Sequence, residues 1–171
     1  MDFDRPILKI IPSRTDILLE RLSILGLAFV WIFTIIQYLK FPNIIPIHFN
    51  AKGIANNYGD KTTIFLVPVI ISVIFIGVTI LNRFPHIFNY SKKITAENAL
   101  TEYTKATKLL RVIKLIIVVF TIILTIDICE SAKTGQSKLP WWIIPIFMIS
   151  MILPIFISLY PSSKNKEKQG S

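Results

Sequence analysis

Residues 115–124 read LIIVVFTIIL, and Thr121 is the only polar residue among them. A helix on the surface of a soluble protein keeps one polar stripe, and this run has none. It belongs to an apolar stretch over about residues 109–128, and three similar stretches cover about residues 22–39, 64–81 and 141–160. At about 1.5 Å per helical residue, each can cross a hydrocarbon core of roughly 30 Å. We therefore predict an all-α membrane protein, built as a four-helix transmembrane bundle.

The composition favours this interpretation over a soluble helical bundle. Hydrophobic residues make up 53% of the 171 residues, and charged residues only 17%. The first stretch begins too far into the chain, and lacks the small-residue cleavage site, for a secretory signal peptide. We interpret it as a spanning helix. Arg111 and Lys114 fall within the third stretch, and we expect their long side chains to snorkel to the interface.

The distribution of basic residues predicts the orientation. Of the 19 Lys and Arg residues, 14 lie before the first span, between the second span and the run that starts at Leu115, or after the fourth span. Because basic loops stay on the cytoplasmic side, we expect both termini in the cytoplasm of a bacterium, with the chain crossing the inner membrane several times. The net charge of +9 then indicates attraction to the anionic lipid of the bilayer, and we expect no nucleic-acid partner.

Three regions follow from this pattern. Residues 1–21 form an amphipathic leader that we place on the cytoplasmic interface, with Pro12 ending any helix there. Residues 22–160 form the four-span membrane domain, and residues 161–171 a disordered cytoplasmic tail. A helix is predicted from Thr95 to Lys108 and should run directly into the third span. Thr95 and Asn98 resemble a weakened capping box at its start.

The loop between the first two spans should be ordered. Pro42, Pro46, Gly53 and Gly59 exclude a helix. Apolar and other residues alternate over positions 45–50, which is typical of a short strand. Ala51, Lys52 and Gly53 would turn it, so we predict a short extracytoplasmic β-hairpin.

Two sequence motifs carry a family resemblance. In the outer loop, Pro42 and Pro46 precede His48-Phe49-Asn50 and Gly53, and Gly59-Asp60-Lys61 stands just before a span. This pattern resembles the family catalogued as domain of unknown function 1648. A second motif resembles the segment leading into the third span of such proteins: Phe88-Asn89-Tyr90-Ser91, Thr95, Asn98, Tyr103 and Lys108-Leu109-Leu110-Arg111.

The resemblance implies small membrane proteins that occur alone or fused to SdpI-type immunity proteins, some of which protect a producer against its own toxin. The SdpI-type region that often follows this domain is not expected after the fourth span, which argues against a direct immunity role.

Five polar residues form the candidate ligand-binding site: His48, Asn50, Lys61, Asp127 and Glu130. Asp127 and Glu130 share a helix face, and Lys61 is the expected partner of Asp127. Trp141 and Trp142 would cover this cluster. The alternatives are that His48 only fixes the loop, that Glu130 is solvated while Asp127 ends the helix, and that the tryptophans belong to an interfacial belt.

We expect neither a metal nor another cofactor, because the outer loop has one histidine and no cysteine. Cys129 should serve packing. No hydrolase or phosphate-binding motif is present, so we expect no enzyme. The predicted function is binding, sensing or immunity-like recognition of a peptide, such as a toxin, or another ligand by the outer loop. The alternative is a transport or regulatory subunit with a partner membrane protein, and an intramembrane hydrolase comes last.

Overall fold

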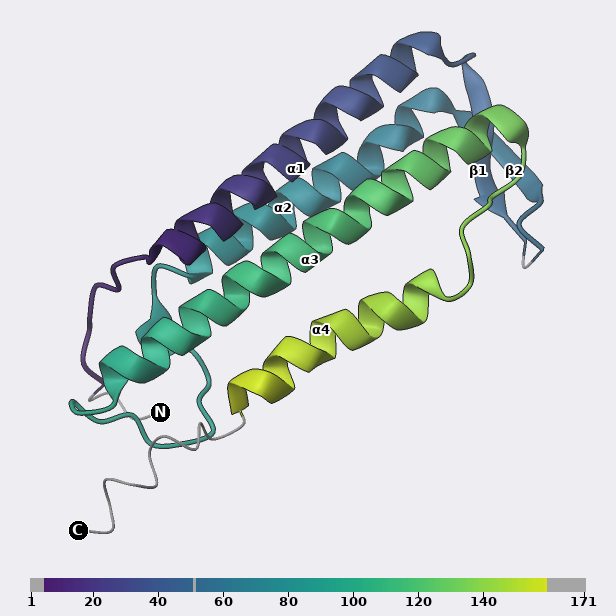
Figure 1. Ribbon diagram of the computed structural model, residues 1–171. Coiled ribbons are helices and arrows are strands. Elements are labelled where there is room, and N and C mark those ends of the chain that lie inside the picture. Colours follow the sequence, from purple (N-terminus) through teal and green to yellow (C-terminus); the bar gives the residue numbers. More distant parts are fainter. Residues whose placement is uncertain (1–4, 51, 160–171) are drawn as a thin grey trace.

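The protein is a bundle of four helices with a two-stranded hairpin at one end (Figure 1). The computed structural model describes residues 5–50 and 52–159, so the predicted tail, Ala51 and the first four leader residues lie outside it. The elements are α1 (Arg14–Lys40), β1 (Ile44–Phe49), β2 (Ala55–Asp60), the 3-10 helix η1 (Lys61–Phe65), α2 (Leu66–Leu81), the 3-10 helix η2 (Pro85–Ile87), α3 (Ala99–Thr134) and α4 (Ile143–Leu159). The predicted helical membrane fold, including the hairpin, is confirmed.

Successive helices run in opposite directions. The hairpin lies at one end, called here the hairpin end, and the leader lies at the other, called the leader end (Figure 1). Among the described residues, three segments are long and apolar enough to cross a membrane: Arg14–Lys40, Lys61–Leu81 and Ala99–Thr134. The fourth helix, α4, is equally apolar, with 17 described residues.

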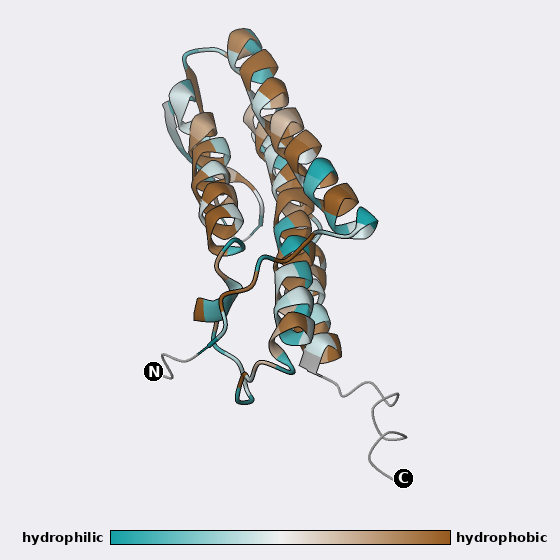
Figure 2. Ribbon diagram, turned by 90° about the vertical axis from the view of Figure 1, so that its left-hand side faces the viewer, coloured by the Kyte–Doolittle hydropathy of each residue, from teal (hydrophilic) through white to brown (hydrophobic). Residues whose placement is uncertain are grey.

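Helix α1 has its polar residues inside and its apolar residues outside. Its buried residues are Asp16, Ser23, Val30, Thr34 and Gln37. The exposed positions of the same helix are dominated by leucine, isoleucine and phenylalanine. Hydrophobic residues make up most of the length of the helices (Figure 2). Helices in lipid gain nothing from burying more apolar surface, and they associate through close packing and polar contacts instead. The distribution fits a bundle surrounded by lipid.

Helices α1 and α3 are in close contact at Gly26. A Cβ atom at Gly26 would lie 2.5 Å from Cγ1 of Val118, which is itself buried. Further along the buried face of α3, Thr121 and Thr125 donate hydrogen bonds to the carbonyls of Ile117 and Thr121, four residues back in the same helix. A glycine on α1, and threonines on α3 whose hydroxyl groups bond to carbonyls of their own helix, therefore let the two backbones pack tightly.

Local sequence explains both ends of α1. Ser13 and Asp16 form a complete capping box, since each side chain bonds the backbone N–H of the other. Pro12 precedes this cap, and residues 5–12 contain no helix, as predicted. At the other end, Phe41 stands before Pro42, which disfavours a helical backbone. Phe41 is extended, with φ −79° and ψ 145°, and α1 ends.

The predicted continuous helix into the third span is confirmed by α3, with 36 residues, but it begins at Ala99 and not at Thr95. Asn98 accepts a hydrogen bond from the backbone N–H of Thr95 at 2.9 Å, so one half of the expected capping box forms. The hydroxyl of Thr95 lowers the pKa of Glu97 below its ordinary value. Gly135, with φ +71°, ends α3 in the left-handed conformation that favours glycine.

Helix α4 is attached to the bundle through α3. The rings of Phe120 on α3 and Phe147 on α4 stack with their centroids 3.9 Å apart. No side chain described in α4 is fully buried. Pro145 falls in the first turn of this helix, where no intrahelical N–H bond is lost, and Pro154 lies inside it.

Candidate functional site

The hairpin rests on the ends of the helices around a small apolar core. Phe41, Ile45, Ile64 and Cys129 are buried together, so one side of β1 is fixed against α1, η1 and α3. Cys129 is a free, buried thiol, and its predicted packing role is confirmed. The short strand predicted over residues 45–50 is confirmed by β1, but Ile47 is exposed because the register shifts between Pro46 and His48.

Backbone contacts tie the hairpin turn to the segment after α3. Ser137 N–H donates to the Gly53 carbonyl at 2.8 Å, and Ala55 N–H donates to the Gly135 carbonyl at 3.0 Å. Gly53 has φ +74°, and a Cβ there would lie 2.9 Å from the Ser137 carbonyl oxygen. Glycine is therefore required at position 53 both by the turn and by this contact.

Gly53→Ala is expected to loosen the hairpin from the bundle and to lower the free energy of unfolding by about 1–3 kcal/mol, from the left-handed backbone and the clash with Ser137. Hydrogen exchange at the Ala55 and Ser137 amides should speed up. Gly135→Ala is the matched control, because Gly135 has the same φ sign but no atom within 4 Å of the added Cβ. Equal acceleration in both variants would contradict a role for the contact.

The ammonium group of Lys61 lies at the carboxyl end of α1 and does not pair with Asp127. Its Nζ lies 3.3 Å from the Phe41 carbonyl oxygen and 4.6 Å from the centre of the Tyr38 ring. A cation at the carboxyl end of a helix is favoured by the helix dipole. Among the described residues Lys61 has no ion pair. The predicted Lys61–Asp127 pair is wrong, because Lys61 is held above the end of α1 while Asp127 finds neutral donors.

Asp127 and Glu130 have separate roles. Asp127 accepts hydrogen bonds from the Ser137 hydroxyl at 2.8 Å and from the Lys138 backbone N–H at 3.1 Å, and so fixes the chain after α3. Glu130 is exposed and pairs with Lys133 at 2.7 Å. The solvated alternative for Glu130 is confirmed. Asp127 does not end the helix, since α3 continues to Thr134.

Trp141 and Trp142 do not cover a polar cluster, because their side chains are 81% and 46% exposed at the start of α4. This exposure fits the interfacial belt that was the alternative interpretation.

His48 and Asn50 shape the hairpin in different ways. The His48 Nδ1 lies 2.6 Å from Asn56 Oδ1 on the opposite strand, and an amide oxygen accepts, so Nδ1–H donates. The Asn50 side chain accepts from the backbone N–H groups of Lys52 and Ile54, which closes the turn. Both residues belong to the hairpin, but Asp127 and Glu130 lie elsewhere, so the five candidates do not form one cluster.

The second motif builds a different structure at the leader end. Tyr103 is fully buried with Ile94 and Ala99, and Leu8 and Ile10 of the leader pack against them. Arg5 donates to the Phe88 carbonyl at 2.7 Å and lies over the Tyr90 ring. Burial raises the pKa of Tyr90, so its phenol stays neutral. The predicted leader is thus folded onto the loop between α2 and α3.

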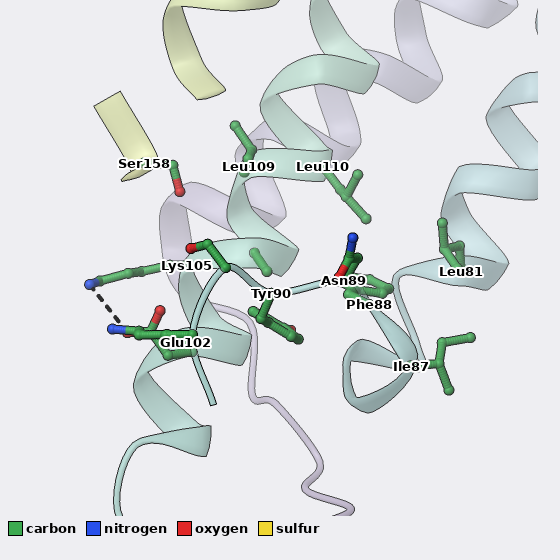
Figure 3. A pocket seen from close by; sticks show the side chains of 13 residues that line it. Leu81, Ile87, Phe88, Asn89, Tyr90, Glu102, Lys105, Leu109, Leu110 and Ser158 are labelled. Carbon is green, nitrogen blue, oxygen red and sulfur yellow. Dashed lines mark ion pairs between the residues drawn. The ribbon is translucent and has the colours of Figure 1, made fainter. Parts of the chain in front are cut away.

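An open groove lies beside this cluster, with a volume of about 470 Å³ (Figure 3). Leu81, Leu109 and Leu110 provide apolar walls, and Asn89 lies at its polar side. Two lysines of its lining, Lys92 and Lys105, are already paired with Glu102, at 2.9 and 3.5 Å.

The structure also shows buried charges that the sequence analysis did not identify. Lys114 is 3% exposed and contacts Glu20 of α1, the Thr79 hydroxyl of α2 at 2.9 Å, and the Phe75 ring, so it does not snorkel as expected. One turn away, Arg111 approaches Asp16 with 3.7 Å between Nη1 and Oδ1. The spacing of these residues was the available signal. Asp16 and Glu20 are four residues apart on α1, and Arg111 and Lys114 are three residues apart on α3, so the two acids share one helix face and the two bases share another.

Comparison with known proteins agrees with the outer-loop motif. Residues 25–72 match the model of the family described as "Domain of unknown function (DUF1648)". A relative from Archaeoglobus fulgidus, described as "Uncharacterized protein", is 24% identical over 152 residues, covering 81% of this chain and 83% of the relative. No solved structure matches. The matched residues contain the first motif and not the second, and over them the chain is similar to the DUF1648 family.

Proposed function

We propose that the hairpin is a binding surface, and that this membrane protein senses or sequesters a peptide or another ligand at the outer face of a cell membrane. The observation that carries the proposal is the exposed apolar group on a fixed scaffold. Ile44, Ile47, Ile54 and Tyr58 are between 42% and 59% exposed. They stand on a hairpin that is tied to α3 through Gly53 and Ser137. Preorganised apolar and aromatic groups lower the entropy cost of binding.

His48 and Asn56 add a polar pair beside these apolar side chains. Mixed aromatic and amide groups of this kind suit recognition of a peptide. Asp60 lies at the base of the hairpin, and the backbone N–H of Thr62 lowers its pKa, so it stays charged at neutral pH. The excess of basic residues at the leader end supports a cytoplasmic position for both termini, with the hairpin outside. We propose the inner membrane of a bacterium, or an equivalent cell membrane, as the location.

Photocrosslinking tests the proposal. A photoreactive amino acid is placed at Asn57 on the hairpin, and in a separate variant at Ile70 on the exposed face of α2. The Asn57 variant should give a peptide or protein adduct in living cells, and the Ile70 variant should give lipid adducts. Ile44→Ser with Tyr58→Ser should remove the Asn57 adduct while leaving thermal stability unchanged, since both side chains are exposed. Lipid adducts alone at Asn57 would contradict the proposal.

A regulatory or transport subunit is the second candidate, and α4 favours it. None of the described side chains of α4 is fully buried, so this helix has apolar surface available for a partner membrane protein. A stable heteromeric complex in mild detergent, with crosslinks from Ile149, would support the subunit. Toxin protection by the chain alone would support an immunity-like sensor. We propose no enzymatic activity, and product formation that disappears in His48→Ala would overturn this.

A further inference from the structure

A polar pocket opens between α1, the end of α2 and Arg111 of α3, and it is called here the arginine pocket. Its volume is about 350 Å³, and its lining contains Pro12, Asp16, Ile17, Glu20, Arg21, Thr79, Asn82, Arg83 and Arg111. Three arginines and two acids meet where the apolar parts of α1 and α2 end. Since the hydrocarbon core of a bilayer surrounds the apolar parts of spanning helices, its phosphates are expected just beyond the ends of these parts, at the level of the pocket.

Three buried polar atoms of this lining have no hydrogen-bond partner among the described residues. They are Oδ1 of Asp16, Oδ1 of Asn82 and Nη1 of Arg111. Asp16 is only 3% exposed, and the 3.7 Å between its Oδ1 and Arg111 Nη1 is too long for a hydrogen bond. Buried polar groups are nearly always satisfied, so the pocket calls for a ligand that both accepts and donates.

The unpaired donor and the unpaired acceptors of this pocket define the chemistry of that ligand. Arginine side chains bind phosphate oxygens through paired N–H donors. Arg21 and Arg83 are exposed at the pocket, and Arg111 is deeper. The carboxylate oxygen of Asp16 and the amide oxygen of Asn82 can only accept, so they need an ammonium or hydroxyl donor.

We propose that the arginine pocket binds a phosphodiester headgroup that carries a hydrogen-bond donor, supplied by a phospholipid of the surrounding bilayer. The phosphate contacts the arginines, and the ammonium or hydroxyl group of the headgroup contacts Asp16 and Asn82. The groove near Lys92 and Lys105 differs, because its lysines are already paired with Glu102. The proposal is independent of what the hairpin binds.

Headgroup choice gives the first test. The full chain is delipidated in detergent, and binding of phosphatidylethanolamine, phosphatidylglycerol and phosphatidylcholine is measured by native mass spectrometry. All three carry the phosphate, but the choline headgroup has no donor. Binding of the ethanolamine and glycerol lipids should be about tenfold tighter or more, as expected for a lost charge-assisted bond. Equal binding of all three lipids would overturn the proposal.

Side-chain variants give the second test. Arg21→Gln with Arg83→Gln should weaken binding of phosphatidylethanolamine about tenfold or more. The matched control is Lys92→Gln with Lys105→Gln, which removes the same charge from the same end of the bundle and should leave binding unchanged. An equal loss of lipid binding in both double variants would show that the net charge of this end attracts the lipid, and would overturn the arginine pocket as the binding site. The lipid comparison on the unaltered chain remains decisive if the arginine variant fails to fold.

The source of the headgroup is tested with soluble compounds. Glycerophosphoethanolamine and inorganic phosphate should bind at least about tenfold more weakly than the lipid, because they lack the acyl chains that place the headgroup at this depth. Equally tight binding of glycerophosphoethanolamine would support the headgroup chemistry and overturn the lipid as its source.

Discussion

Glu20→Met is expected to lower the free energy of unfolding by about 3–5 kcal/mol, the range seen when one partner of a buried ion pair is removed. Lys114 is almost completely buried, and Glu20 is its only charged partner among the described residues. Without Glu20, the ammonium group keeps the Thr79 hydroxyl and the Phe75 ring. Neither neutralises its charge. Reversible unfolding in detergent measures the change.

The double variant Glu20→Met with Lys114→Met separates the pair from the packing. Replacing both charges by apolar groups of similar size should recover most of the stability lost in Glu20→Met, because no buried charge is left alone. Glu130→Met is the matched control, since its pair with Lys133 is exposed and such pairs contribute at most about 1 kcal/mol. A similar loss in Glu20→Met and Glu130→Met would disprove the importance of burial.

Gly26→Leu is expected to separate α1 from α3 and to prevent stable assembly of the bundle. Even a single Cβ at this position lies 2.5 Å from Val118 Cγ1 and 3.4 Å from Ile122 Cδ1. Gly26→Ala alone should destabilise by about 1–3 kcal/mol, the usual cost of an overpacked core. Val118→Ala combined with Gly26→Ala should recover part of this loss by making room.

Gly77→Ala is the control for Gly26, because no atom lies within 4 Å of a Cβ added there. Alanine is the better helix former by about 1 kcal/mol, so Gly77→Ala should be neutral or stabilising. Unfolding in detergent and recovery of folded monomer measure both variants. A Gly26→Ala protein as stable as Gly77→Ala would show that the two helices are not in close contact at this point.

The sequence predicted the elements of this fold well, because their signals are local. Apolar length gave the spans, and Pro42 and Gly53 gave the start and the turn of the hairpin, whereas the helix predicted from Thr95 begins four residues later, at Ala99. Helix α1 begins earlier than its predicted span, since Ser13 and Asp16 cap it well before its apolar part begins, whereas α4 begins two residues later than predicted.

The candidate site was harder to predict, because its contacts join distant segments. Asp127 and Lys61 were paired by charge and by their expected height in the membrane. The structure instead gives Asp127 the hydroxyl of Ser137, which a sequence offers no reason to choose over many other donors. Lys114 was treated as a residue at the membrane edge, because its partner Glu20 is 94 positions away.

Helix α4 is attached to the bundle through α3, and this attachment decides how it responds to its surroundings. At about 1.5 Å per residue, its 17 described residues extend over about 26 Å. No hydrogen bond or ion pair joins α4 to α3 within the described chain, so dispersion forces alone hold it there. Mismatch costs a fraction of a kcal/mol per ångström, which is enough to slide or tilt a weakly held helix. Bilayer thickness is therefore expected to set the position of α4, while the other three helices keep theirs.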